Sequence, residues 1–165
     1  SVAWPRDEER LMSVEPYEID PNDRAVIVEI LARYAEAVDA GDFAAVGELL
    51  GDATLVDGHG STIAAGAQAI AELFEATTTR FADGTPQTSH VITNAIVDRI
   101  DNDTVEMRSR FVVLQATERL ALQPIAVGRY VDRVERRGGT WRIVKRQMLP
   151  QLWGDTSQHL TFDPR

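Results

Sequence analysis

The side chains best suited to proton transfer in this sequence are three histidines, because the chain contains no cysteine. An imidazole titrates near neutral pH, as a general acid or base must. His90 falls in a mostly apolar segment, where it is either a hydrogen-bonded core residue or an acid–base group. His59 lies between two glycines, which indicates a loop, and nothing in the sequence assigns a role to His159.

The spacing of these histidines argues against a metal centre. They lie far apart, and the sequence has no HxH or HxxxE pattern that would bring two ligands together. The lack of cysteine also excludes disulfides and thiolate chemistry. The sequence therefore predicts no metal and no organic cofactor.

Three other polar side chains are candidates for a buried site. Tyr34 shares the apolar face of a predicted helix, as a core tyrosine or as a pocket group. Asp39 borders that face and can accept a hydrogen bond from a histidine ring, unless it simply lies in solvent at the helix end. Asp57 precedes Gly58, and is a pocket acid or only a turn residue.

Helices are expected in the first half of the chain. Asp20 and Pro21 form a helix start, and Gly41 ends that helix. Its apolar residues recur at helical spacing: Ile27, Ile30, Leu31, Tyr34 and Val38. Asp42 caps a shorter second helix, residues 53–57 read as a short strand, and a third helix runs from about residue 66 to 81.

Strands are expected after Pro86, at residues 88–100, 104–117, 124–137 and 140–149. Apolar and charged residues alternate in the second of these, which predicts a sheet with one buried face. We expect an α+β fold in which a curved antiparallel sheet wraps round three N-terminal helices as a cone. Its hollow would hold a small apolar molecule. Strand parity and position give these lining candidates: Phe111, Gln115, Tyr130, Met148 and Trp153.

The composition fits one domain, with 165 residues of which 44% are hydrophobic. We expect tails at residues 1–20 and 156–165 and a single domain at 21–155. A net charge of −9 disfavours nucleic acid and anionic membranes as partners. No apolar run approaches a membrane span, and the first residues lack the apolar core of a signal peptide, so a cytoplasmic location is expected.

Five segments together resemble the SnoaL-like, nuclear-transport-factor-like superfamily. They are residues 33–43, 52–57, 89–94, 128–133 and 139–143. The resemblance covers roughly residues 20–155. It implies the cone-shaped fold and commonly a homodimer formed through the outer sheet face. This superfamily includes dehydratases, isomerases and polyketide cyclases, but also non-catalytic binding modules and oxygenase β-subunits, so the fold alone does not give a reaction.

Two patterns within the superfamily suggest site residues. The scytalone-dehydratase type implies His90 as general acid/base with Asp39 as its partner. Its second histidine, on the next strand, has no counterpart in residues 113–116. The ketosteroid-isomerase type implies Tyr34 and Asp57 as oxyanion donor and base. Its second acid has no counterpart near Gly128.

The leading hypothesis is a cofactor-independent lyase or isomerase that acts on a small apolar oxygenated ring compound of polyketide, aromatic or steroid type. His90 and Asp39 would transfer the proton, and Tyr34 and Asp57 would hold the substrate oxygen. The alternative is a non-catalytic ligand-binding or assembly module of the same fold. A third possibility is a structural partner of a larger oxygenase.

Overall fold

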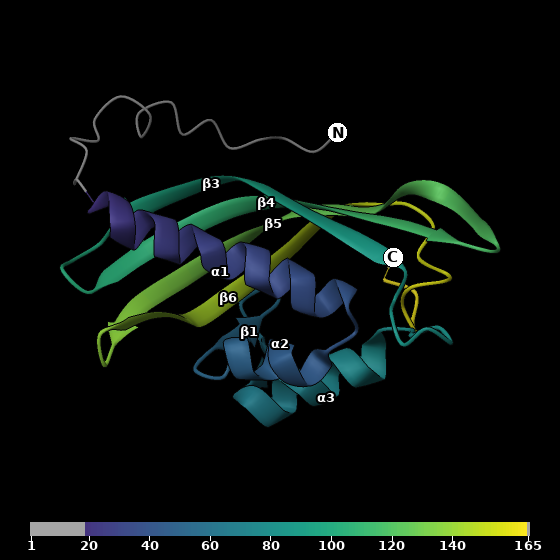
Figure 1. Cartoon of the computed structure of the whole chain (residues 1–165), viewed down its shortest axis with the longest axis horizontal. Helices are drawn as coiled ribbons and strands as arrows, with labels where there is room; N and C mark the ends of the chain where they lie inside the picture. Colours follow the sequence, from purple (N-terminus) through teal and green to yellow (C-terminus); the bar gives the residue numbers. More distant parts are fainter. Residues whose placement is uncertain (1–18, 165) are drawn as a thin grey trace.

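The computed structural model describes residues 19–164 of the chain (Figure 1). Its elements in order are α1 (Pro21–Asp39), α2 (Phe43–Leu49), β1 (Thr54–Val56), β2 (Thr62–Ala65), α3 (Ala67–Thr77), β3 (Thr88–Arg99), β4 (Thr104–Thr117), β5 (Leu120–Arg137) and β6 (Thr140–Trp153). Residues 1–18 of the predicted N-terminal tail lie outside the described part. No helix within residues 19–164 is long and apolar enough to cross a membrane.

Helix α1 begins and packs as its sequence predicts. The Asp20 carboxylate accepts a hydrogen bond from the Asn22 backbone N–H at 2.8 Å, and proline occupies the first turn. The five apolar residues that were expected to face the core are all buried: Ile27, Ile30, Leu31, Tyr34 and Val38. Figure 1 shows α1 lying across the curved sheet, with α2 and α3 below its C-terminal half in this view.

Gly41 fixes the turn that ends this helix. It adopts a positive φ of 70°, and a Cβ at this position would lie 2.2 Å from the Gly84 carbonyl oxygen. The chain can therefore reverse direction here only because residue 41 has no side chain. The turn packs against the loop that leads into β3, because Gly41 lies next to Gly84 and its carbonyl accepts from Arg80.

The sheet has six strands in the order β2-β1-β6-β5-β4-β3. Its long strands β3 to β6 form an antiparallel meander, as expected, while β1 runs parallel to β6 and makes the sheet mixed. Strand β4 has the predicted alternation, with Val105, Met107, Phe111 and Val113 buried. The α+β fold with three helices and a curved sheet is thus confirmed.

Several elements differ from those that the sequence indicated, and strand β6 continues to Trp153 instead of ending at Leu149. Strand β2 was not expected, because it has only four residues and most of them are exposed. Helix α3 ends at Thr77 instead of continuing to Phe81. Strand β5 begins at Leu120 instead of Pro124. A register shift lies next to Pro124, which has no backbone N–H to donate to the neighbouring strand.

Candidate functional site

A cavity of about 390 Å³ lies between the helices and the inner face of the sheet. This volume suits a small organic ligand. Its walls are mainly apolar: Val38, Ile63, Leu73, Phe74, Phe111, Val113, Ala126, Met148, Pro150, Trp153, Leu160, Phe162 and Pro164. Ile63 and Phe162 are also solvent-exposed, which places them at the opening.

Most of the residues proposed from the sequence meet in this cavity. Seven of them line it: Tyr34, Asp57, His90, Phe111, Tyr130, Met148 and Trp153. Asp39 and Gln115 are not among the lining residues. They lie behind the wall, where each makes hydrogen bonds that hold a neighbouring segment in place.

The His90 imidazole is paired with the Asp39 carboxylate. His90 Nδ1 lies 2.6 Å from Asp39 Oδ1, and the His90 side chain is only 6% exposed. The His90 backbone N–H donates to Asp39 Oδ2 at 2.8 Å, and the Thr88 hydroxyl donates to Oδ1 at 2.8 Å. The start of β3 is therefore fastened to the end of α1 through one carboxylate.

These hydrogen bonds offset an unfavourable position for an acid. Asp39 is the last residue of α1, where the helix dipole disfavours a negative charge. Burial raises the pKa of Asp39, but the hydrogen bonds and charge of His90 and the Thr88 hydroxyl outweigh it, so the pKa is lowered overall. The ionised carboxylate can only accept, so His90 Nδ1 carries a proton. In the neutral imidazole, Nε2 is the nitrogen left for a ligand.

Two tyrosines stand beside His90 on the wall. The Tyr34 ring meets the His90 ring edge-on at 6.4 Å and the Tyr130 ring edge-on at 5.9 Å. Tyr130 stacks on Phe111 with ring centroids 4.6 Å apart. Gly128 pairs with Phe111 across the strands, and a Cβ at Gly128 would lie 2.5 Å from the Phe111 ring. The position that could have supplied a second acid is thus filled by an aromatic ring.

A buried ion pair lies behind the tyrosines. Arg146 donates from Nε and Nη2 to the two oxygens of Asp132, each at 2.8 Å, and both side chains are essentially inaccessible to solvent. The guanidinium carbon lies 4.5 Å from the Tyr34 ring centroid and 4.3 Å from that of Tyr130. This contact is a cation–π interaction with both rings, and it fixes their positions.

Both phenols keep their protons at physiological pH. Burial raises the pKa of Tyr34 above its usual value of 10, although the nearby Arg146 charge opposes the shift. Burial and the neighbouring Tyr34 raise the pKa of Tyr130 well above that value. The two hydroxyls also hydrogen-bond to each other, which raises the pKa of Tyr130 and opposes the rise at Tyr34, as expected if Tyr130 donates to the Tyr34 oxygen. The Tyr34 hydroxyl can therefore donate a hydrogen bond to an oxygen inside the cavity.

Asp57 lies at the cavity edge but is occupied by its own turn. Its Oδ1 accepts from the backbone N–H groups of His59 at 2.8 Å and Ser61 at 2.9 Å. The Ser61 hydrogen bond is the largest cause that lowers the pKa of Asp57. The carboxylate is thus ionised and engaged, which makes it a weak base.

The C-terminal segment, defined here as residues 154–164, packs back over the cavity. The Thr79 backbone N–H donates to the His159 carbonyl at 2.8 Å, and Leu160 forms an isolated β-bridge with Thr78. Gln115 Nε2, which is buried, donates to the carbonyls of Gln158 and Pro86, each at 3.0 Å. The segment, expected as a tail from residue 156, therefore forms part of the wall.

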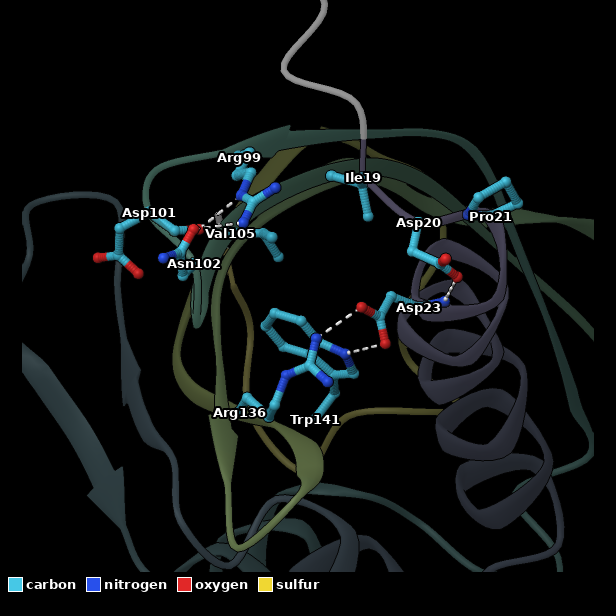
Figure 2. Close-up of a pocket in the computed structure, with 10 residues that line it drawn as sticks. All are labelled: Ile19, Asp20, Pro21, Asp23, Arg99, Asp101, Asn102, Val105, Arg136 and Trp141. Atoms are coloured by element: carbon cyan, nitrogen blue, oxygen red, sulfur yellow. Dashed lines mark hydrogen bonds and ion pairs between the residues drawn. The ribbon is translucent and has the colours of Figure 1, made fainter.

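A larger pocket of about 650 Å³ lies near the N-terminal end of α1 (Figure 2). Figure 2 shows Arg136 and Trp141 pointing toward Asp23, which accepts from both at 2.6 and 2.9 Å. Arg99 donates to the Asn102 side chain at 2.6 Å. The Asp23 charge is thus balanced by Arg136, and the Arg99 guanidinium is held by the Asn102 side chain.

Sequence reasoning missed three residues of the candidate site. Asp132 shares the parity of buried neighbours in β5, and a charge at such a position signals a buried partner. Arg146 gave no such signal, because a register shift between Arg133 and Val134 reverses the parity in β6. His159 lies in an irregular segment without a period. Within residues 19–164, no three His, Asp or Glu side chains gather as a metal site would require.

Comparison with known proteins gives a family and a fold. A family model described as a SnoaL-like domain matches residues 21–147. A search of curated proteins found no match. Among solved structures, an NTF2-like protein with a cystatin-like fold from Novosphingobium aromaticivorans is 26% identical. The match covers 83% of this chain and 86% of that one, with a TM-score of 0.65.

Two further structures share the fold at lower identity. A protein of unknown function with a cystatin-like fold from Nostoc punctiforme is 24% identical over 81% of this chain and 95% of that one, with a TM-score of 0.66. A proposed scytalone dehydratase from Novosphingobium aromaticivorans is 20% identical over 81% and 87% of the two chains, with a TM-score of 0.65.

Proposed function

This chain belongs to the SnoaL-like family, and from that premise we propose that it is a cofactor-independent acid–base enzyme. It acts on a small apolar ring compound that carries a carbonyl oxygen. The reaction moves a proton to or from the carbon beside that carbonyl, as in an isomerisation, dehydration or cyclisation. The single observation that carries the proposal is the His90–Asp39 pair in the wall of an apolar cavity.

His90 is the proton acceptor and donor. Asp39 holds the proton on Nδ1, so that Nε2 presents its lone pair to the ligand. When Nε2 takes a proton from the carbon, the imidazolium that forms is stabilised by the carboxylate 2.6 Å away. The same nitrogen then returns the proton, at a second carbon or to a leaving hydroxyl.

Tyr34 holds the ligand oxygen, and the Tyr130 hydroxyl supports it by donating to the Tyr34 oxygen. Loss of a proton from the carbon places negative charge on the carbonyl oxygen, and a fixed hydroxyl donor stabilises this charge in a site shielded from water. Asp57 is less suited to this role, because its ionised carboxylate cannot donate a hydrogen bond. Phe111, Met148 and Trp153 supply apolar surface for the ring.

The experiment is deuterium exchange in heavy water, followed by NMR, with α-tetralone as the probe. This bicyclic ketone has an apolar ring and protons beside its carbonyl. The wild-type protein should accelerate exchange of those protons, and His90→Gln should lower the rate by at least about 100-fold. His59→Gln, the same change at an exposed loop histidine, should leave the rate unaltered.

The non-catalytic alternative makes an opposite prediction. A binding module would take up the ketone, with a change in Trp153 fluorescence, but would exchange its protons no faster than buffer. Exchange that persists in His90→Gln would show that another group transfers the proton. Either result would contradict the proposed function.

The outer face of the sheet fits a second copy of the chain. Four apolar residues lie in register across it: Val91, Val112, Val127 and Leu152. Val91 is 45% and Leu152 64% exposed, although both are apolar. We therefore propose a homodimer through this face. Leu152→Arg should shift the mass measured by light scattering from dimer to monomer, and an unchanged mass would rule this face out.

A further inference from the structure

The C-terminal segment carries a second imidazole into the wall of the cavity. His159 and His90 both line it, although they lie 69 positions apart along the chain. Backbone hydrogen bonds fix His159 on both sides: its carbonyl accepts from Thr79, and its N–H donates to the Thr156 carbonyl at 2.9 Å. The position of this ring is therefore set by the fold.

The ring has hydrogen-bonding capacity that the protein does not use. His159 is only 9% exposed, and its Nδ1 is buried without a hydrogen-bond partner among residues 19–164. A buried polar atom without a partner is costly and requires an explanation, such as a bound group that completes its hydrogen bonding. The backbone already secures the segment, so packing alone does not explain an imidazole here.

The electrostatic surroundings keep this imidazole uncharged. Burial, together with the nearby His90, lowers the pKa of His159 to about 4, although Asp39 opposes the shift. At neutral pH the ring can therefore both donate and accept a hydrogen bond. It also does not repel His90 when His90 holds a proton.

We propose that His159 binds a second oxygen of the ligand, most directly a hydroxyl group on the ring compound. A hydroxyl fits because it can donate to or accept from an imidazole in either tautomer. The inference rests on the proposed function and deepens it. It divides the ligand into a carbonyl end held by Tyr34, a reacting carbon near His90, and a hydroxyl end near His159.

The structure thus assigns a specificity role to a residue outside the domain core. An apolar ring ketone without a hydroxyl should enter the cavity but leave the His159 ring unsatisfied. A hydroxylated ketone of matching geometry gains one hydrogen bond to His159. Its dissociation constant should therefore be roughly tenfold lower than that of the ketone without the hydroxyl. The preference should depend on His159 and not on His90.

The test compares α-tetralone with a set of its ring-hydroxylated derivatives, using the full chain. Dissociation constants are measured by fluorescence, and deuterium exchange is followed in parallel. The wild-type protein should prefer at least one hydroxylated isomer by about tenfold. His159→Phe, which keeps a ring but removes both nitrogens, should abolish that preference while α-tetralone binding changes little.

Two comparisons separate this role from a structural one. His159→Gln, which retains a donor and an acceptor, should recover part of the preference, and His59→Gln should keep all of it. A preference that survives in His159→Phe, or no preference in the wild-type protein, would overturn the inference. Failure of the proposed function would appear differently, as a hydroxyl preference in binding without any deuterium exchange.

Discussion

Asp39 Oδ1 lies 2.6 Å from His90 Nδ1, although the two residues are separated by 51 positions along the chain. The pair joins the last residue of α1 to the third residue of β3. A carboxylate at this end of a helix is unfavourable unless it is compensated, and three hydrogen bonds provide that compensation. The arrangement therefore points to a role for the carboxylate beyond helix stability.

Asp39→Asn should inactivate the protein without unfolding it. The asparagine amide would donate to His90 Nδ1, so the imidazole proton would move to Nε2 and the lone pair facing the ligand would be lost. We expect the rate of α-tetralone deuteration to fall by about 100- to 10,000-fold. Nitrogen-15 shifts of the His90 ring measure the tautomer directly. An unchanged rate with a changed tautomer would contradict the role assigned to Asp39.

Tyr34→Phe should lower the exchange rate while leaving ligand binding nearly unchanged. The hydroxyl is expected to contact the oxygen mainly as negative charge develops on it, so its loss affects kcat more than KM. Removing one such donor costs about 100- to 1,000-fold. Tyr130→Phe is the companion variant at the second hydroxyl. If both variants exchange at the wild-type rate, the oxygen is held elsewhere.

Acid should destabilise the wild-type protein through His159. Its folded-state pKa of about 4 lies below the ordinary 6.5, so the unfolded chain binds the proton first as the pH falls. The contribution of His159 to the free energy of unfolding is fully present above pH 6.5. About 3 kcal/mol of this contribution is lost progressively as the pH falls to 4. His159→Gln should lack this component. Urea unfolding of both proteins at several pH values measures the difference, and parallel curves would contradict it.

The buried ion pair predicts an unequal response to single and double substitution. Asp132→Leu leaves the Arg146 charge buried without its partner, which should cost about 3–5 kcal/mol of unfolding free energy. Adding Arg146→Met removes the unpaired charge and should recover most of that loss. Urea unfolding gives both values. A double variant as unstable as Asp132→Leu would show that packing against the tyrosines, and not charge, dominates.

Gln115→Leu should loosen the C-terminal segment selectively. The substitution removes the amide that donates to the Gln158 and Pro86 carbonyls, at a cost of about 1–3 kcal/mol. Hydrogen exchange should quicken in residues 154–164 while the amides of β4 stay protected. Uniform loss of protection across the sheet would instead indicate that Gln115 supports the core as a whole.

Local patterns in the sequence were sufficient to predict that the three helices and the four-strand meander exist. The buried face of α1 follows directly from the spacing of its apolar residues, and the inner face of β4 follows from alternation. The β1–β6 pairing could not be predicted in this way, because it joins distant strands through backbone hydrogen bonds that leave no side-chain period. Strand β2 escaped detection for a similar reason, since its short exposed run has no pattern.

The candidate site was predictable where its residues lie on regular elements. Tyr34 was found because the spacing of a helix face places it, and His90 because it lies in an apolar strand segment that resembles the scytalone-dehydratase type. Arg146 was hidden by a local register shift, and His159 by the irregular segment that carries it. Such positions depend on tertiary contacts that no local period encodes.

The most direct test of the account is the stereochemistry of α-tetralone deuteration in heavy water. In the proposed function His90 alone transfers the proton, from one side of the cavity, so the wild-type protein should replace only one of the two protons beside the carbonyl. His90→Gln should add no deuterium above the buffer rate. Equal replacement of both protons, or replacement that persists without His90, would contradict the assignment of this cavity as an acid–base site.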